Sequence, residues 1–133
     1  MSELNNVVIN DGAATPVAHT FKPRAVANGI ATLVESTGVP LADKRLTLSI
    51  QRTAQSRAKP TIKFAMPVVQ DATVNGVTKP TIVRTAYADI TFNFDPSSST
   101  QERKDLVAQV RNLLADDQTM AHALLVDLED IWG

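Results

Sequence analysis

Three stretches of the chain alternate between apolar and polar residues, and this pattern constrains the fold more than any other feature. They span residues 46–51, 61–66 and 87–94. Because successive side chains of a β-strand point to opposite faces, each stretch predicts a strand that buries one face only. Together they predict a sheet with an apolar and a polar face. The polar face collects small hydroxyls, one lysine, one aspartate and the only tyrosine, Tyr87.

The N-terminal part of the chain predicts a β-hairpin and one further strand. Residues 1–8 and 15–21 are strand candidates, and Asn10-Asp11-Gly12 between them is a strong turn signal. Residues 26–34 are the next strand candidate, and residues 36–40 have the composition of a loop.

Two connections and the remaining strands follow. Residues 55–60 are polar and basic, which is typical of a hairpin tip. A strand is expected over residues 61–69, and residues 82–94 are expected to form the longest strand. Between these two strands, residues 70–80 predict a long loop around Asn75-Gly76.

The hydrophobic period changes to a helical one near the C-terminus. Ser99-Thr100-Gln101-Glu102 has the pattern of a capping box, so a helix is expected to begin there. Its apolar stripe consists of Leu106, Val107, Val110, Leu113 and Leu114. Asp116-Asp117 then predicts a break and the start of a second helix. The stripe of that helix consists of Met120, Leu124, Leu125 and Leu128.

The order of elements predicts an α+β fold in one domain, residues 1–133: an N-terminal hairpin, an antiparallel sheet and two C-terminal helices. The chain has 133 residues, 44% of them hydrophobic and 20% charged, which is typical of a folded globular protein. The apolar face of the sheet needs a cover. Periodicity does not decide whether the helices cover their own sheet or that of a neighbour.

Composition excludes several kinds of chemistry. The absence of cysteine rules out disulfides, thiolate metal sites and cysteine nucleophiles. No stretch reaches the roughly 18 apolar residues of a membrane span. His19 and His122 have neither a nearby nucleophile nor metal-ligand spacing, and the acidic residues 127–130 are typical of a solvated tail. The sequence therefore predicts no enzyme, no cofactor and no metal.

Charge is polarised along the chain although the formal net charge is −1. Residues 43–63 contain six basic residues and one acidic residue, a local charge of +5. Residues 116–133 contain five acidic residues and no lysine or arginine, a local charge of −5. Because the local sign decides what a face attracts, the strands within residues 43–63 suit an anionic partner.

Three features together resemble the coat protein of single-stranded RNA bacteriophages, the leviviruses, and most closely the Qbeta-type branch. They are Arg84-Thr85-Ala86-Tyr87-Ala88-Asp89-Ile90-Thr91-Phe92, the strand pair of residues 45–63, and the helix start Ser99–Arg103. The resemblance is collinear from the N-terminal hairpin to Trp132. It implies a hairpin, a five-stranded antiparallel sheet and two helices.

The resemblance also implies an assembly. Two subunits would join edge to edge into an interlocked dimer with a continuous ten-stranded sheet, the helices of each packing across the sheet of the other. Such dimers would form an icosahedral shell around single-stranded genomic RNA, in a virion assembled in the bacterial host cytoplasm. The protein would also bind an operator stem-loop at the replicase start as a translational repressor. No membrane and no small-molecule substrate is implied.

The resemblance assigns site residues by position. The family's adenine-binding positions fall on Ile30, Thr47, Ser49, Thr61 and Lys63, of which Ile30 is the apolar member. The stacking aromatic falls on Tyr87, and a second loop contact falls on Asp89. This suits RNA, because unpaired bases stack on aromatic rings and bond to small hydroxyls.

Cations near these positions suit phosphates, which position RNA without reading its sequence. Arg45, Arg57 and Lys59 are the expected phosphate contacts. Gln51 occupies a position that is arginine in some relatives, and Ala65 replaces a polar residue. The Qbeta shell is cross-linked by cysteines in the loop equivalent to residues 70–80, so this chain is expected to form a shell without covalent links.

Other interpretations are compatible with the residues alone. Tyr87 could pack against a cross-strand neighbour, and Asp89 could form a cross-strand ion pair. The chain could also be a free RNA-binding regulator that forms no shell. A small-molecule enzyme using a cleft under the helices is disfavoured by the missing nucleophile–base pairs.

Overall fold

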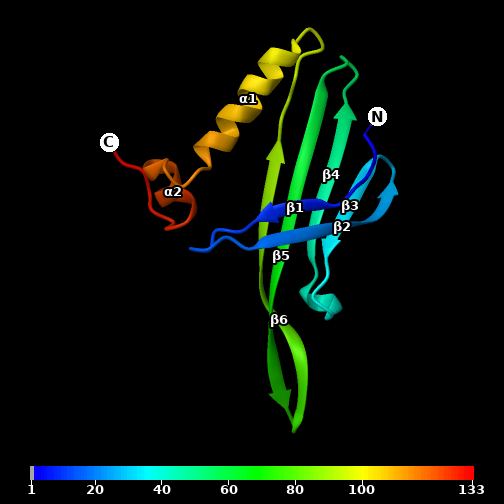
Figure 1. Ribbon diagram of the computed structural model, residues 1–133, viewed down its shortest axis with the longest axis vertical. Coiled ribbons are helices and arrows are strands. Elements are labelled where there is room, and N and C mark those ends of the chain that lie inside the picture. The colour runs from blue at the N-terminus through cyan, green and yellow to red at the C-terminus, as the bar shows by residue number, and fades with distance from the viewer. Residues whose placement is uncertain (1) are drawn as a thin grey trace. The chain divides into compact units, whose positions relative to one another are not determined.

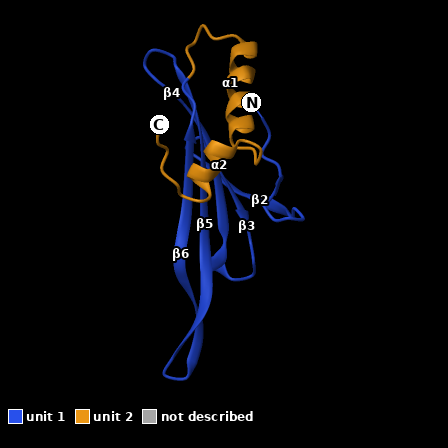
Figure 2. Ribbon diagram, turned by 90° about the vertical axis from the view of Figure 1, so that its left-hand side faces the viewer, with its two compact units in different colours: residues 1–93 blue, residues 94–133 orange. Residues whose placement is uncertain are grey.

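The computed structural model describes residues 2–133, which fall into two compact units, residues 1–93 and 94–133 (Figures 1 and 2). The first unit is a β-sheet and the second contains two α-helices, which confirms the predicted α+β class. Within residues 2–133, neither helix combines the length and the apolar character that a membrane crossing requires.

Six antiparallel strands form the sheet, and their spatial order follows the sequence from β1 to β6. They are β1 (Val7–Asn10), β2 (Ala18–Ala27), β3 (Ile30–Glu35), β4 (Lys44–Arg52), β5 (Ala58–Val74) and β6 (Val77–Thr91), with a short 3-10 helix η1 (Pro40–Ala42) before β4. β2 pairs first with β1 and then with β3. The predicted hairpin therefore shares a strand with the five-stranded sheet, which makes six strands in all.

The prediction of one strand over residues 26–34 is wrong, because the chain reverses direction between Ala27 and Ile30. Asn28 (φ 54°) and Gly29 (φ 76°) are both left-handed and connect β2 to β3. This is the geometry of a two-residue hairpin turn, for which Asn-Gly is strongly preferred. The local turn preference outweighs the apolar run around it.

The long loop predicted over residues 70–80 is also wrong. β5 and β6 continue as a paired hairpin to Val74 and Val77, joined by Asn75 (φ 53°) and Gly76 (φ 78°). β5 has 17 residues and β6 has 15, so β5 is the longest strand. The Thr73 and Thr78 hydroxyls lie 2.9 Å apart near the tip. Asn-Gly in the middle of a polar stretch again marks a tight turn.

The core of the first unit lies on the apolar face of the sheet. Phe21, Leu33 and Leu46 are buried, and six residues pack around them: Leu4, Val7, Ile9, Leu48, Ile62 and Phe64. The rings of Phe21 and Phe64 meet edge to face with their centroids 6.2 Å apart. Because β2 and β5 are not neighbours in the sheet, this contact places the β1–β2 hairpin across the apolar face (Figure 1).

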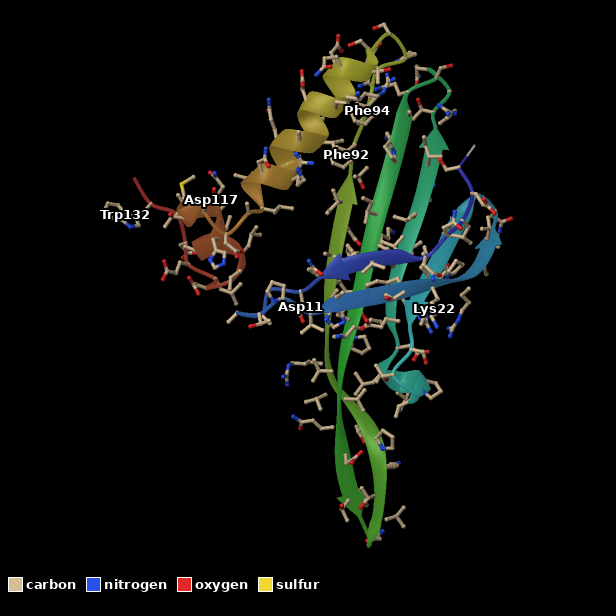
Figure 3. All side chains as sticks on the ribbon, in the orientation of Figure 1. Asp11, Lys22, Phe92, Phe94, Asp117 and Trp132 are labelled. Atoms are coloured by element: carbon tan, nitrogen blue, oxygen red, sulfur yellow. The ribbon has the colours of Figure 1, made fainter. Side chains whose placement is uncertain are left out.

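The first helix of the second unit begins where the sequence predicts it. Ser99 is the N-cap of α1 (Thr100–Leu113), and its Oγ accepts a hydrogen bond of 3.1 Å from the Glu102 backbone N–H. α2 (Thr119–Leu125) is shorter than predicted, because the chain leaves the helix before Leu128, whose φ is 57°. Trp132 is 93% exposed near the chain end (Figure 3).

Candidate nucleic-acid interface

Strand register places ten of the eleven predicted site residues on one face of the sheet. Thr47 of β4 is directly opposite Thr32 of β3 and Lys63 of β5, and Lys63 is directly opposite Asp89 of β6. Residues directly opposite in an antiparallel sheet point to the same side. The row Thr32, Thr47, Lys63 and Asp89 therefore crosses four strands on one face.

Two parallel rows flank this one. The first joins Ile30, Ser49, Thr61 and Thr91, and the second joins Val34, Arg45, Ala65 and Tyr87. A further pair, Gln51 and Lys59, continues the same face toward the β4–β5 turn. We call this surface the polar face. The residues of the intervening rows, such as Leu46 and Phe64, point to the opposite side and enter the core.

Tyr87 presents its ring to solvent. The side chain is 76% exposed, and its direct cross-strand neighbour is Ala65. A methyl group covers little of an aromatic ring, so Ala65 leaves the tyrosine face open. This geometry weighs against the alternative in which Tyr87 packs on its cross-strand neighbour.

The hydroxyl side chains form a half-buried patch between exposed residues. Thr47, Ser49 and Thr61 are partly buried, whereas Lys63 and Asp89 are exposed. Among the side chains described in residues 2–133, no ion pair joins Lys63 to Asp89, although their backbones are directly paired. The ammonium and the carboxylate can therefore each meet a ligand. Ile30, 42% exposed, adds an apolar surface opposite Ser49.

Arg57 lies outside the strands, in the turn between β4 and β5. Its Nε donates a hydrogen bond of 2.8 Å to Oδ1 of Asn93. Asn93 continues the alternation of Asp89 and Thr91 beyond the end of β6. The bond orients the guanidinium at the edge of the polar face.

The predicted cations give the interface a positive sign. Arg45, Arg57, Lys59 and Lys63 oppose the single carboxylate of Asp89, a formal sum of +3. Arg45 and Lys63 are exposed, and Arg57 and Lys59 are partly buried. An exposed aromatic ring, a hydroxyl patch and surrounding cations are the groups that bind single-stranded nucleic acid.

Two residues of the polar face escaped the assignment from sequence. Thr32 is opposite Thr47, and Thr91 is opposite Thr61. Thr91 was visible in the alternation of β6. Thr32 was hidden, because residues 26–34 appeared as one strand and the face of a residue depends on where its strand begins.

The remaining titratable residues include two histidines, His19 and His122. In the part of the chain that the structure describes, no group of three or more histidine or acidic side chains has the arrangement of a metal site. His19 forms hydrogen bonds with Asp11 and Glu35.

Comparison with known proteins identifies the chain's relatives. The family model of the levivirus coat protein matches residues 2–132. The capsid protein of Pseudomonas phage PRR1 is 40% identical over 131 residues, which cover 98% of this chain and 100% of the relative. The capsid protein of Escherichia virus Qbeta is 34% identical over 136 residues, covering 98% of this chain and 96% of that protein.

Solved structures show the same fold. The virus-like particle of bacteriophage NT-214 matches with a TM-score of 0.85 and 23% identity, over 98% of this chain and 100% of the other. An unassembled bacteriophage coat protein dimer, described as RNA-binding, matches with a TM-score of 0.68 and 21% identity, over 98% of each chain. The named relatives are capsid proteins, which have a structural rather than an enzymatic role. This chain belongs to the levivirus coat protein family.

Proposed function

We propose that this capsid protein forms a dimer, that the dimers assemble into an icosahedral shell around single-stranded RNA, and that the polar face binds an operator stem-loop to repress translation at the replicase start. The observation that carries the proposal is the register of β3 to β6. It gathers Tyr87, Lys63 and the hydroxyls of Thr47, Ser49 and Thr61 on one accessible face.

The chemistry of the polar face suits an RNA loop. Tyr87 offers a flat surface on which an unpaired base can stack. Thr47, Ser49 and Thr61 offer donors and acceptors to base edges, and Lys63 adds three N–H donors beside them. Asp89 repels phosphates, so we assign it a selective role: it accepts a base amino hydrogen or excludes unsuitable loops.

Phosphate contacts surround this base-binding centre. Arg45, Arg57 and Lys59 lie on the polar face or at its edge, where the backbone of a bound loop would pass. Their attraction supplies affinity without sequence preference. Gln51, opposite Lys59, would add a neutral hydrogen-bonding group.

The surface of the single chain supports a dimer. β6 is the last strand of the sheet, so its outer edge has no strand beside it within the described chain. Ile50 and Met66, on the apolar side, are 51% and 37% exposed, and Leu114 and Met120 of the second unit are 50% and 65% exposed. Joining two sheets at β6, with each subunit's helices on the sheet of the other, would pair the edge and bury this surface.

We further propose that residues 1–133 act as one domain within the virion, after assembly in the bacterial host cytoplasm. The shell would be held by noncovalent contacts, because the chain contains no cysteine. The similarity to capsid proteins and to a virus-like particle supports this part of the proposal.

Expression of the chain, followed by native sizing and electron microscopy, tests the assembly. We expect regular particles that contain RNA. Nuclease treatment of disassembled dimers before reassembly provides the control for the role of RNA. A dimer that binds RNA stem-loops but never forms particles would instead establish a free RNA-binding regulator.

A further inference from the structure

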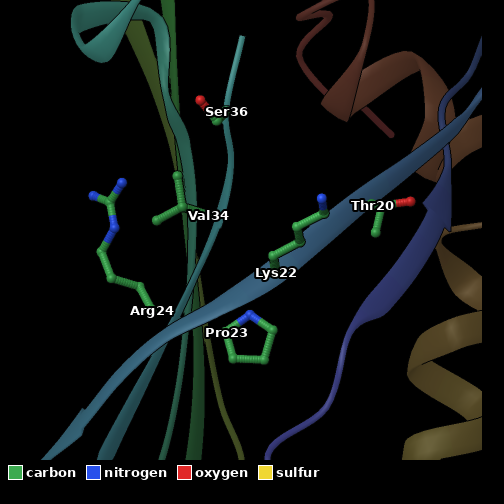
Figure 4. Close-up of a pocket in the computed structure, with 6 residues that line it drawn as sticks. All are labelled: Thr20, Lys22, Pro23, Arg24, Val34 and Ser36. Carbon is green, nitrogen blue, oxygen red and sulfur yellow. The ribbon is translucent and has the colours of Figure 1, made fainter. Parts of the chain in front are cut away.

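A second cationic surface lies on β2 and β3, away from the proposed base-binding centre. It forms a pocket of about 300 Å³ (Figure 4). The pocket is lined by Thr20, Lys22, Pro23, Arg24, Val34 and Ser36. Two cations and two hydroxyls around one hollow are the groups that bind a phosphate oxygen.

The two cations lie beside a β-bulge. Lys22 is opposite Val34, but the register shifts between Pro23 and Ala25, so Arg24 is an extra residue without a partner in β3. Proline lacks an amide donor and is tolerated at such irregularities. A bulge redirects the side chains around it. Lys22 and Arg24 lie on either side of Val34 (Figure 4).

Packing defines the floor and one wall of the pocket. Val34 is only 5% exposed and forms the floor. Arg24 Nη2 lies 3.4 Å from Oδ2 of Asp43, which is 8% exposed. This ion pair holds the guanidinium in place and neutralises part of its charge. Lys22 is exposed and supplies the uncompensated positive charge.

Register connects the pocket with the polar face. Lys22 is opposite Val34, and Val34 is opposite Arg45, so Lys22, Val34 and Arg45 form one row. Lys22 and Arg45 therefore point to the same side of the sheet, two strand spacings or about 10 Å apart. Ala65 and Tyr87 continue this row across β5 and β6.

We infer that this pocket is an additional phosphate-binding site, which takes a backbone phosphate of RNA that crosses the polar face from β6 toward β2. The inference rests on the proposed function of the polar face. Lys22 supplies the charge, and the hydroxyls of Thr20 and Ser36 donate to the phosphate oxygens. Such a site increases affinity for every RNA and does not discriminate between loops.

The test measures how RNA affinity depends on salt. Lys22→Gln removes the charge and retains much of the side-chain length, and Lys104→Gln on α1 is the matched control for the same loss of charge. Binding of the dimer to two RNA stem-loops with different loop sequences is followed over a range of salt concentrations. Lys22→Gln should lower the magnitude of the slope of log K against log salt by about 0.7 to 0.9, equally for both stem-loops. Lys104→Gln should leave the slope unchanged.

Comparison with Lys63→Ala separates this inference from the proposed function. If Lys63→Ala lowers the slope and Lys22→Gln does not, the pocket binds no RNA phosphate, while the polar face still does. If neither variant changes the slope, the proposed RNA site itself is wrong. A change in loop preference caused by Lys22→Gln would also overturn the inference, because a phosphate contact reads no base. Lys22→Arg keeps the positive charge, so retention of the parent's salt slope in this variant would support the inference.

Discussion

His19 and Glu35 are joined by a hydrogen bond of 2.8 Å between Nδ1 and Oε2, which connects β2 to the end of β3. The other ring nitrogen, Nε2, lies 2.9 Å from Oδ2 of Asp11, in the turn between β1 and β2. Both nitrogens can donate only when the imidazole is protonated. His19 therefore holds the N-terminal hairpin to the sheet as a cation.

The pKa values reflect this arrangement. Hydrogen bonds to Asp11 and then Glu35 raise the pKa of His19 above its usual 6.5. Hydrogen bonds from the Val17 backbone and then from His19 lower the pKa of Asp11 from 3.8 to about 2. Each shift favours the charged form and thereby links folding to pH.

Stability is expected to fall on both sides of a window between about pH 4 and 6.5. A group with a raised pKa stabilises the fold fully below its unfolded pKa, so the contribution of His19 is lost as the pH rises through its raised value. The contribution of Asp11 is present above 3.8 and is lost as the pH falls toward 2. Urea unfolding of the dimer at a series of pH values measures both limbs. His19→Gln should abolish the decrease in stability on the alkaline side. If this decrease persists in the variant, another group causes it.

Tyr87→Ala should weaken binding of the preferred RNA stem-loop by about 1–3 kcal/mol, because the ring is exposed and offers a stacking surface. The dimer should remain intact, because the change leaves the β6 backbone in place and removes a side chain that is 76% exposed on the polar face. Tyr87→Phe retains the ring and should bind nearly as well as the unchanged protein. Filter binding with both variants measures the difference, and equal affinities for Tyr87→Ala and the parent would remove Tyr87 from the site.

Asp89→Asn should alter the choice between stem-loops more than the overall affinity for RNA. The side chain is exposed opposite Lys63, and no ion pair between these two described side chains competes with a ligand. The change removes a charge and converts one acceptor oxygen into a donor. Competition between stem-loops of different loop sequence measures the preference. Uniform weakening or strengthening for all loops would contradict a selective role.

Ser99→Ala should reduce the free energy of unfolding by about 1 kcal/mol. The Ser99 hydroxyl accepts the Glu102 N–H at 3.1 Å, and alanine leaves this backbone donor without its cap. Ser99→Asp provides the control, because aspartate is an equally good N-cap. Equal stability of Ser99→Ala and the parent in urea would show that solvent replaces the cap without loss.

Gly76→Ala should destabilise the β5–β6 hairpin by about 1–2 kcal/mol. The position has φ 78°, which is costly for any residue with a Cβ atom, although no neighbouring atom would contact that Cβ. Gly12→Ala is the matched control, because it also lies in open space but outside the left-handed region. Hydrogen exchange of β5 and β6 amides reports the effect. Equal exchange in both variants would show that the tip tolerates the strain.

Comparison of the predicted and observed elements shows where local reasoning succeeds. The alternation within residues 46–51 and 61–66 predicted β4 and the centre of β5, because a period of two has no other structural explanation. The capping pattern of Ser99 and Glu102 predicted the start of α1, because such a cap depends only on two residues three positions apart in the chain. Two of the errors in the sheet occurred at Asn-Gly turns inside stretches whose surroundings indicated something else. The first strand was also expected over residues 1–8, whereas β1 spans Val7–Asn10.

The amino-acid sequence by itself determined the faces of the residues in the alternating stretches 46–51 and 61–66, the α+β class and the residue types of the polar face, because alternation, capping and residue type are local properties. Only the tertiary structure decided which residues lie opposite one another, as Thr32, Thr47, Lys63 and Asp89 do. It also decided that Lys22 and Arg24 line one pocket beside the bulge in β2. Register depends on the exact residue at which each turn reverses the chain, and a displacement by one residue moves every side chain to the other face.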